Sequence, residues 1–302
     1  MICGYNRGSN SRCLKSVPQL QPEESFNVAA PFRGTPTVLD GRVCFVVCDD
    51  SESRVMSVNV MSVNYRDGSI SHKPFTTKRR FFYAVASRSE SIFIFGGEVY
   101  NGQSVSTCEK LDIASGNLTQ LPEMLPARWN ASALNIPEIG IVVVGGICQD
   151  NRQNRRLRSA EVLVEDPGNE SGWRWIRLNP MLKERDRPGV AYFRGCVVVA
   201  GGRHELYDSS AEYLPLTSIE QTNAQWTRLR DVDGLNLFRT SLALFNNRLI
   251  LLVSGDKRID AYEFLPTEEN QSLANFEWKP IFQRDDFDYA KLLVAREKLE
   301  EH

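Results

Sequence analysis

Runs of β-branched and other apolar residues that end in two glycines recur along the chain. Ile92–Gly97 reads IFIFGG, Val142–Gly146 reads VVVGG, Val197–Gly202 reads VVVAGG, and Leu251–Gly255 is a degenerate copy, LLVSG. The second glycines are 49, 56 and 53 residues apart. Apolar residues at consecutive positions are typical of strands that are buried on both faces. A period near 50 residues made of strands predicts a β-propeller with one four-stranded sheet in each repeat.

Other residue types follow the same period in a fixed order around each glycine pair. A glutamate and then a tryptophan come after the pair, and an arginine opens each unit. Glycine pairs allow backbones to approach closely, and a tryptophan can fill the gap between two sheets while its indole N–H donates a hydrogen bond. The structural landmarks are Gly96, Gly97, Gly145, Gly146, Gly201 and Gly202; Glu109, Glu161 and Glu212, with Glu263 in the fourth copy; and Trp175, Trp226 and Trp278.

This order of landmarks resembles the kelch repeat, which has a glycine doublet, a Glu-Tyr-like pair, a tryptophan and a Met-x-x-x-Arg-like turn. The turns here run from Met124 to Arg128 and from Met181 to Arg185-Asp-Arg187. The resemblance covers essentially the whole chain and is strongest in the three middle units. It departs from the pattern at Asp49-Asp50 and Ser254-Gly255, which stand in place of glycine pairs, and at Leu118, which stands in place of a tryptophan.

The resemblance and the repeat length together predict one all-β domain over residues 1–302, a six-bladed kelch β-propeller whose last blade is closed by N- and C-terminal strands. The blades are expected at about 33–78, 79–126, 127–184, 185–236, 237–285, and 286–302 plus 1–32. Closing the ring with both chain ends would protect strand edges that an open seam exposes. The C-terminal strand is expected over 289–295, although Ala290–Glu301 is also rich in helix-forming residues. Because the chain starts inside a blade, we expect it to be one domain of a longer protein.

The composition restricts the classes of partner. The chain has 36 basic and 38 acidic residues and a net charge of −2, which favours neither nucleic acid nor an acidic membrane as partner. It has no apolar stretch long enough to span a bilayer and no signal peptide at its N-terminus, so we expect a cytoplasmic protein. The seven cysteines show no CxxC pair and are expected to be buried small residues in a reducing compartment.

The sequence contains few groups suited to catalysis. There are three histidines, none with a partner at metal-ligand spacing, and there is no nucleophile motif or phosphate-binding glycine loop. The segment Gly201-Gly202-Arg203-His204 is interpreted as a glycine pair followed by loop residues. We therefore expect no enzyme activity, no cofactor and no metal.

The remaining candidate for function is a loop surface rich in arginine. Loops from a fourth strand to the next first strand, and from a second strand to a third, open on one face. Guanidinium groups there would suit the carboxylates of an acidic protein or peptide, and aromatic residues, Phe82 among them, would pack on it. The alternatives are that the strand-entrance arginines tie one blade to the next, and that the arginines of 152–158 belong to a solvated insertion. The candidate partner-binding residues are Arg33, Arg80, Arg128, Arg187 and Arg239 at strand entrances, Arg155 and Arg156 in the longest loop, and Trp129 and Tyr207.

The resemblance is greatest to the kelch domain of BTB–kelch proteins. It implies a protein-interaction module in which the propeller recognises the substrate, while a separate BTB domain, absent from this chain, joins a cullin-3 ubiquitin ligase. In that subfamily a strand-entrance arginine reads acidic peptides; Arg187-Pro188-Gly189-Val190 matches this motif best, and Arg128 next. An actin-binding kelch protein is the alternative function, and an enzyme on the same scaffold is disfavoured by the small number of histidines.

Overall fold

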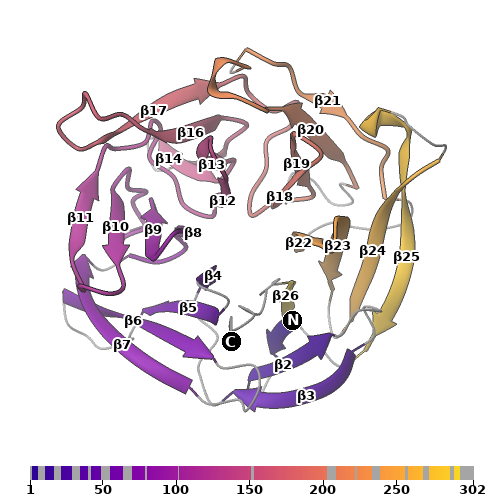
Figure 1. Ribbon diagram of the computed structural model, residues 1–302, viewed down its shortest axis with the longest axis horizontal. Helices are drawn as coiled ribbons and strands as arrows, with labels where there is room; N and C mark the ends of the chain where they lie inside the picture. Colours follow the sequence, from indigo (N-terminus) through magenta and orange to yellow (C-terminus); the bar gives the residue numbers. More distant parts are fainter. Residues whose placement is uncertain are drawn as a thin grey trace, which may run out of the picture.

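The computed structural model consists of antiparallel β-sheets arranged around an axis (Figure 1). It describes residues 2–5, 11–16, 22–28, 35–39, 42–48, 55–63, 70–78, 80–100, 102–150, 153–202, 209–221, 223–232, 239–255, 258–267, 272–285 and 289–292. In these ranges there is no α-helix, and the only helical turns are the 3₁₀ turns η1 (Ile219–Gln221) and η2 (Leu273–Asn275). The architecture is all-β and propeller-like, as the repeat predicts.

Within the described ranges the strands form six four-stranded sheets, which we number along the chain. Sheet 1 contains β4 (Thr35–Leu39), β5 (Arg42–Cys48), β6 (Val55–Val63) and β7 (Ile70–Lys78). Sheet 2 contains β8 (Ala84–Arg88), β9 (Ser91–Phe95), β10 (Cys108–Asp112) and β11 (Leu118–Leu121). Sheet 3 contains β12 (Ser132–Ile136), β13 (Gly140–Val144), β16 (Ala160–Glu165) and β17 (Trp173–Leu178).

Sheets 4 and 5 continue the same order, and sheet 6 combines the two ends of the chain. Sheet 4 contains β18 (Gly189–Phe193), β19 (Cys196–Ala200), β20 (Ala211–Pro215) and β21 (Thr227–Arg228). Sheet 5 contains β22 (Thr240–Phe245), β23 (Arg248–Ser254), β24 (Ile259–Pro266) and β25 (Phe276–Arg284). Sheet 6 contains β26 (Tyr289–Leu292), β1 (Ile2–Tyr5), β2 (Ser11–Ser16) and β3 (Pro22–Val28).

The C-terminal segment is a strand where the structure describes it. β26 pairs antiparallel with β1, with Ile2 opposite Leu292 and Tyr5 opposite Tyr289. The strand expected over 289–295 is therefore present at 289–292, where the helical alternative is wrong, and residues 293–302 lie outside the described part.

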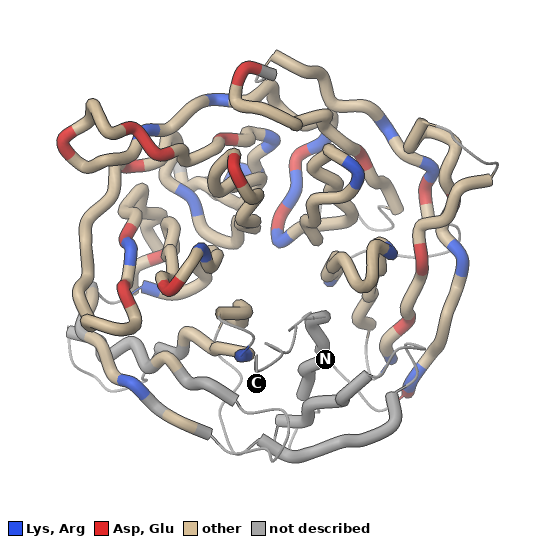
Figure 2. The backbone as a smooth tube through the Cα atoms, in the orientation of Figure 1, with Lys and Arg blue, Asp and Glu red and all other residues tan. Residues whose placement is uncertain are grey.

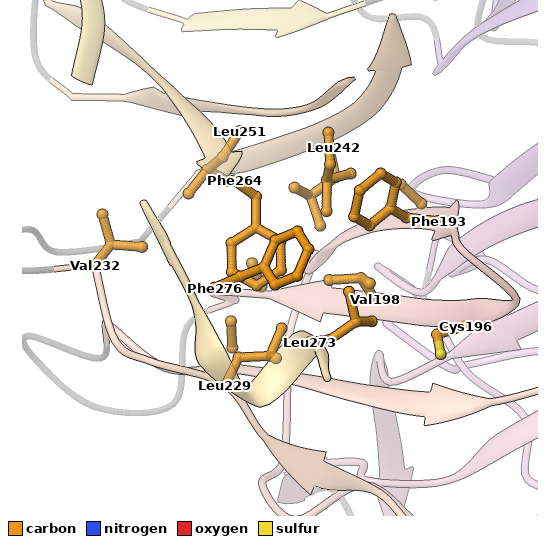
Figure 3. Packing of buried hydrophobic residues seen from close by; sticks show 14 of the residues in the cluster. Phe193, Cys196, Val198, Leu229, Val232, Leu242, Leu251, Phe264, Leu273 and Phe276 are labelled. Carbon is orange, nitrogen blue, oxygen red and sulfur yellow. The ribbon is translucent and has the colours of Figure 1, made fainter. Parts of the chain in front are cut away.

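The second strand of each middle sheet is buried on both faces because neighbouring sheets cover it. The residues of β13 from Ile141 to Val144, and those of β19 from Val197 to Ala200, are all fully buried. Four of the hydrophobic clusters of the described residues lie between adjacent sheets. One cluster joins β13 and β16 of sheet 3 to β19 and β20 of sheet 4. Another joins sheets 4 and 5 through Phe193, Phe264 and Phe276 (Figure 3).

The glycine pairs lie where one sheet meets the loop that leads into the first strand of the next sheet, which we call its entry loop. Gly96 has φ of +60°, and a Cβ on it would come within 2.2 Å of the carbonyl oxygen of Arg128. Gly145 has φ of +63°, with the carbonyl oxygen of Arg185 at 2.6 Å from such a Cβ. A side chain at either position is excluded by the backbone conformation and by the neighbouring loop. The doublets thus permit close contact between successive sheets.

The first strands surround a hollow of about 720 Å³ at the axis. β4, β8, β12, β18 and β22 all contribute to its lining, largely with small residues such as Ala84, Ser132 and Gly189. Small side chains near the axis allow the sheets to converge there. No helix among the described residues is long and apolar enough to cross a membrane.

The register corrects one repeat landmark. In sheets 2, 3 and 4 the glutamate of the third strand lies opposite Ile94, Val143 or Val199, two positions before a glycine pair. In sheet 5 the equivalent residue, Leu252, lies opposite Ala261. Glu263 is therefore not the fourth copy of this glutamate; its carboxylate binds Arg248 on β23 instead.

The four cysteines whose side chains the structure describes are buried in the sheets and form no disulfide with one another. Burial raises the pKa of the Cys108 thiol from 9.0 to about 12. Because the thiolate is the reactive form, a rise of this size lowers the reactive fraction at pH 8 roughly a thousandfold. We expect iodoacetamide to leave Cys108 unmodified in the folded protein and to label it after urea unfolding, as measured by mass spectrometry of its tryptic peptide. Labelling at equal rates in both states would contradict this placement.

Candidate functional site: the arginine-rich loop face

Three entry loops carry a buried arginine that holds one sheet to the next. Arg128 is fully buried, and its guanidinium forms an ion pair with Glu161 of the same sheet and donates to the carbonyl of Gly145 at 3.2 Å. Its own backbone carbonyl accepts a hydrogen bond from Gly97 of the preceding sheet at 2.8 Å. The residue is thus bonded to sheet 2 through its backbone and to sheet 3 through its side chain.

The buried arginine–glutamate pair recurs in the sheets on either side. Arg80 is 2% exposed and binds Glu109 at 2.5 Å. Arg185 is 1% exposed, binds Glu212 at 2.8 Å, and its backbone carbonyl accepts from Gly146 at 2.8 Å. The prediction that Arg80 and Arg128 contact a partner is therefore wrong, because buried ion pairs occupy their guanidinium groups. The alternative, that strand-entrance arginines tie sheets together, describes their geometry.

Arg185, rather than Arg187, is the equivalent of Arg128. Each buried arginine lies 16 or 17 residues before the first glycine of its pair, at Gly96, Gly145 or Gly201. Arg187 lies 14 residues before Gly201, and its side chain is 46% exposed. The spacing to the glycine pair could have identified Arg185 from the sequence, and with it the glutamate partner.

Arg187 instead shares its position with Phe82 and Asn130. All three have positive φ, at 54°, 55° and 56°. Their backbones are linked, since the amide of Asn130 donates to the carbonyl of Phe82 at 2.7 Å and the amide of Arg187 donates to the carbonyl of Asn130 at 2.9 Å. The entry loops of sheets 2, 3 and 4 therefore form a hydrogen-bonded arc close to the axis, and this arc presents the side chain of Arg187 to solvent.

A hollow of about 300 Å³ opens beside this arc. The antiparallel order of the sheets places the entry loops and the loops between second and third strands on the same face. The hollow combines both kinds of loop, and its lining carries three guanidinium groups and one carboxylate. Its residues are Trp129, Asn130, Ile147, Asn154, Arg156, Asp186, Arg187 and Arg239.

The hairpin of β14 (Ile147–Asp150) and β15 (Gln153–Arg156) forms one wall of the hollow. It is fixed by two backbone hydrogen bonds between Trp129 and Ile147, at 2.8 and 2.9 Å. Arg156 is half-buried in this wall, whereas Arg155 is exposed on the same strand. Arg155 and Arg156 thus belong to a paired hairpin, and Arg156 faces the same hollow as Arg187.

Aromatic rings border the cationic hollow. The rings of Phe82 and Trp129 have their centres 5.7 Å apart, and the guanidinium carbon of Arg187 lies 5.2 Å from the centre of the Phe82 ring. Among the described residues, the carboxylate paired with Arg187 is that of Asp186, at 3.9 Å. Arg187 therefore keeps an exposed positive charge next to an exposed apolar ring.

The exposed large hydrophobic side chains in the described part of the chain all belong to this face. They are Phe82, Tyr100, Leu125 and Leu182, between 50% and 88% exposed. Phe82, Leu125 and Leu182 lie in entry loops, and Tyr100 lies between β9 and β10. Figure 2 shows basic and acidic positions interspersed around the described backbone, so the positive character of the hollow comes from where side chains converge.

The candidate residues from the sequence thus separate into groups. The structure brings together Arg187, Arg239, Arg156 and Trp129 at the hollow. It places Arg155 on β15, the strand that also carries Arg156. Arg33 and Tyr207 lie outside the described residues. Asn154 and Asp186 line the hollow and were not anticipated, because their loop positions match no repeat landmark. No group of histidine, cysteine, aspartate and glutamate suited to a metal occurs among the described residues.

Comparison with known proteins gives the fold but no family. No protein-family model matches the chain, and no curated protein matches it in sequence. Among solved structures it is similar to the one described as "Structure of YjhT", with a TM-score of 0.58 and 14% sequence identity over 84% of this chain and 80% of that chain. At this identity the similarity concerns the fold alone.

Proposed function

We propose that this chain is a six-bladed kelch-type β-propeller whose loop face binds an acidic segment of a partner protein. The six four-stranded sheets and the pairing of β1 with β26 support the blade number and the closure by the two chain ends. The glycine, glutamate and tryptophan landmarks support the kelch type. The observation that carries the binding function is the hollow whose lining has three arginines and one aspartate, beside the exposed ring of Phe82 and the partly buried ring of Trp129.

The chemistry of this hollow favours a carboxylate ligand. Guanidinium groups bind carboxylates through planar paired hydrogen bonds. The exposed ring of Phe82 and the partly buried ring of Trp129 would exclude water from such contacts, as aromatic residues do at protein interfaces. The buried arginines contribute by fixing the entry loops from which Arg187 projects. By resemblance to BTB–kelch proteins, we propose that the bound partner is a substrate presented to a cullin-3 ubiquitin ligase.

Charge reversal at the hollow should abolish the binding of acidic peptides. The probe is a fluorescein-labelled dodecapeptide with four glutamates and one leucine, compared with its glutamine counterpart by fluorescence polarisation. In the double variant Arg156→Glu/Arg187→Glu we expect affinity for the acidic peptide to fall roughly 30- to 150-fold, corresponding to about 2–3 kcal/mol. Both side chains are at least partly exposed, so the thermal midpoint should stay unchanged.

Arg174→Glu is the matched control, because this side chain is 49% exposed on β17 and remote from the hollow. It should leave peptide affinity unchanged. Equal affinity for the acidic and glutamine peptides, or equal losses in the control and the double variant, would refute the site. A pull-down with the intact gene product, probed for cullin-3, tests the adaptor role separately.

A further inference from the structure

The three arginines that line the loop-face hollow come from three different sheets. Arg156 ends β15 in the hairpin between β13 and β16 of sheet 3, and Arg187 belongs to the entry loop of sheet 4. Arg239 directly precedes β22 of sheet 5, and its backbone carbonyl accepts from the amide of Ser254 at 2.9 Å. A group bound in the hollow therefore meets guanidinium groups that belong to separate parts of the ring.

Backbone hydrogen bonds hold two of these arginines in one frame. Leu157, the neighbour of Arg156, accepts from the amide of Arg185 at 3.0 Å. Two residues further on, the amide of Arg187 donates to the carbonyl of Asn130 at 2.9 Å. The backbones that carry Arg156 and Arg187 are thus joined to each other through sheet 3 before any ligand is present.

The lining of the hollow has a double positive charge. It contains three guanidinium groups and the carboxylate of Asp186, a net formal charge of +2 among the described residues. Arg156 and Arg239 are half-buried, and such groups are screened by water less than exposed ones. One glutamate side chain would balance half of this charge. A phosphorylated side chain carries about −1.5 to −2 at pH 7 and would balance most of it.

The size and shape of the hollow favour a compact anion. Its volume of about 300 Å³ is at the lower end of ligand pockets, which suits a side-chain group better than a whole peptide segment. A carboxylate has two oxygens in one plane and pairs with one guanidinium fork. A phosphoryl group has three terminal oxygens that point in different directions. Guanidinium groups that arrive from three sheets can therefore each bind a different oxygen of a phosphoryl group.

The apolar part of the lining suits the stem of such a side chain. Trp129 and Ile147 line the hollow beside the arginines, and their backbones are joined by two hydrogen bonds. The ring of Phe82 lies next to Trp129, with ring centres 5.7 Å apart. These groups provide an apolar wall close to the cationic centre, on which the carbon atoms of a phosphorylated residue would pack.

We propose that this hollow binds a phosphorylated side chain of the partner protein, with Arg156, Arg187 and Arg239 as the phosphoryl-binding residues. The inference rests on the proposed function, because it concerns the same hollow and specifies the anionic group that enters it. Clusters of arginine are a general means of recognising phosphorylated peptides. Partner binding at this face then depends on prior action of a protein kinase on the partner.

The test replaces one glutamate of the fluorescein-labelled acidic dodecapeptide by phosphoserine, phosphotyrosine or serine. By fluorescence polarisation with the full chain, we expect phosphoserine or phosphotyrosine to tighten binding about tenfold relative to glutamate, and serine to weaken it. Comparison of the two phosphorylated peptides shows which residue carries the phosphoryl group.

The pH dependence provides a second readout. From pH 7.5 to pH 5.5 the phosphopeptide should lose about fourfold in affinity, because the second pKa of its phosphate is near 6. The all-glutamate peptide, measured at the same two pH values, corrects for any titration of the protein itself. A phosphopeptide whose affinity changes no more than that of the all-glutamate peptide would contradict the binding of a phosphate dianion.

Neutral variants test the role of the third arginine. Arg239→Gln should reduce the preference for phosphoserine or phosphotyrosine over glutamate from about tenfold to below about threefold, while the all-glutamate peptide changes little. Arg156→Gln serves the same purpose if Arg239→Gln lowers the thermal midpoint. Arg174→Gln, which alters an exposed arginine on β17, is the matched control and should keep the full preference.

The peptide series separates this inference from the proposed function. If the all-glutamate peptide binds and phosphorylation adds nothing, the phosphoryl preference is overturned and the acidic-segment site stands. If only the phosphopeptides bind, the phosphoryl site is supported and binding of unmodified acidic segments is refuted. Absence of binding by every peptide refutes both. Retention of the preference in both glutamine variants, or displacement of the phosphopeptide by a lower concentration of single-stranded oligonucleotide, also overturns the proposal.

Discussion

Replacing Arg128 by methionine is expected to destabilise the protein by about 3–5 kcal/mol, the usual effect of breaking a buried ion pair from one side. Methionine keeps most of the apolar stem but leaves the Glu161 carboxylate, whose side chain is 3% exposed, without its partner. It also removes donors from the carbonyls of Gly145 and Ser159. Urea unfolding of the variant and the unmodified chain measures the difference.

The pH dependence of this loss identifies its cause. Burial raises the pKa of Glu161 above its ordinary value of 4.5 and lowers the pKa of Arg128. Without the arginine the folded-state pKa of Glu161 should rise further. When the pKa of a carboxyl is higher in the folded state than in the unfolded state, the group costs no folding stability below its unfolded pKa. The protein loses stability as the pH rises from there through the folded pKa. The variant should therefore be closer to the unmodified chain at pH 4 than at pH 7.

Two controls test the interpretation. Arg128→Met/Glu161→Leu removes both charges and should recover part of the loss, although the carbonyls of Gly145 and Ser159 stay unpaired. Arg174→Met breaks an exposed pair with Asp166 and should change stability by less than about 1 kcal/mol. If Arg128→Met costs under about 1 kcal/mol, or its cost is the same at both pH values, the buried pair does not hold the sheets together.

Trp226→Ala should cost about 3–5 kcal/mol, as large-to-small changes in a core do. The ring is 5% exposed and packs in the cluster between sheets 3 and 4, together with Met181, Val199 and Leu214. Alanine leaves a cavity at this seam and also removes the donor to the carbonyl of Asn179. Equilibrium urea unfolding followed by circular dichroism gives the value.

Phenylalanine variants separate packing from hydrogen bonding. Trp226→Phe keeps most of the apolar contact and should cost about 1 kcal/mol more than Trp278→Phe, because the Trp278 indole has no acceptor among the described residues. A near-neutral Trp226→Ala would show that this tryptophan does not bridge the two sheets.

The repeated architecture follows from local sequence signals. Val142–Val144 and Val197–Val199 were expected to be doubly covered strands, and all are fully buried. This agreement has a direct cause, since consecutive β-branched residues suit a pleated strand and bury apolar area on both faces. The role of the glycine pairs could also be predicted from the sequence, because Gly96 and Gly145 adopt backbone conformations that other residues rarely take.

Only part of the proposed binding surface could be predicted from the sequence. Arg187, Arg239, Arg156 and Trp129 were chosen for residue type and loop position, and they line one hollow. Arg80 and Arg128 were chosen on the same grounds and are buried. Residue type does not distinguish these groups, because a guanidinium can bind a partner's carboxylate or one within its own sheet.

The amino-acid sequence by itself determined the repeat length, the strands and the residues that pack between the sheets, because these depend on local conformational preference and on burial of apolar side chains. Only the tertiary structure decided which arginine faces solvent. Arg185 and Arg187 are two residues apart in one loop, yet the first meets Glu212 inside the sheet seam and the second projects beside Phe82. That difference depends on backbone direction and on partners distant in sequence, which no local pattern contains.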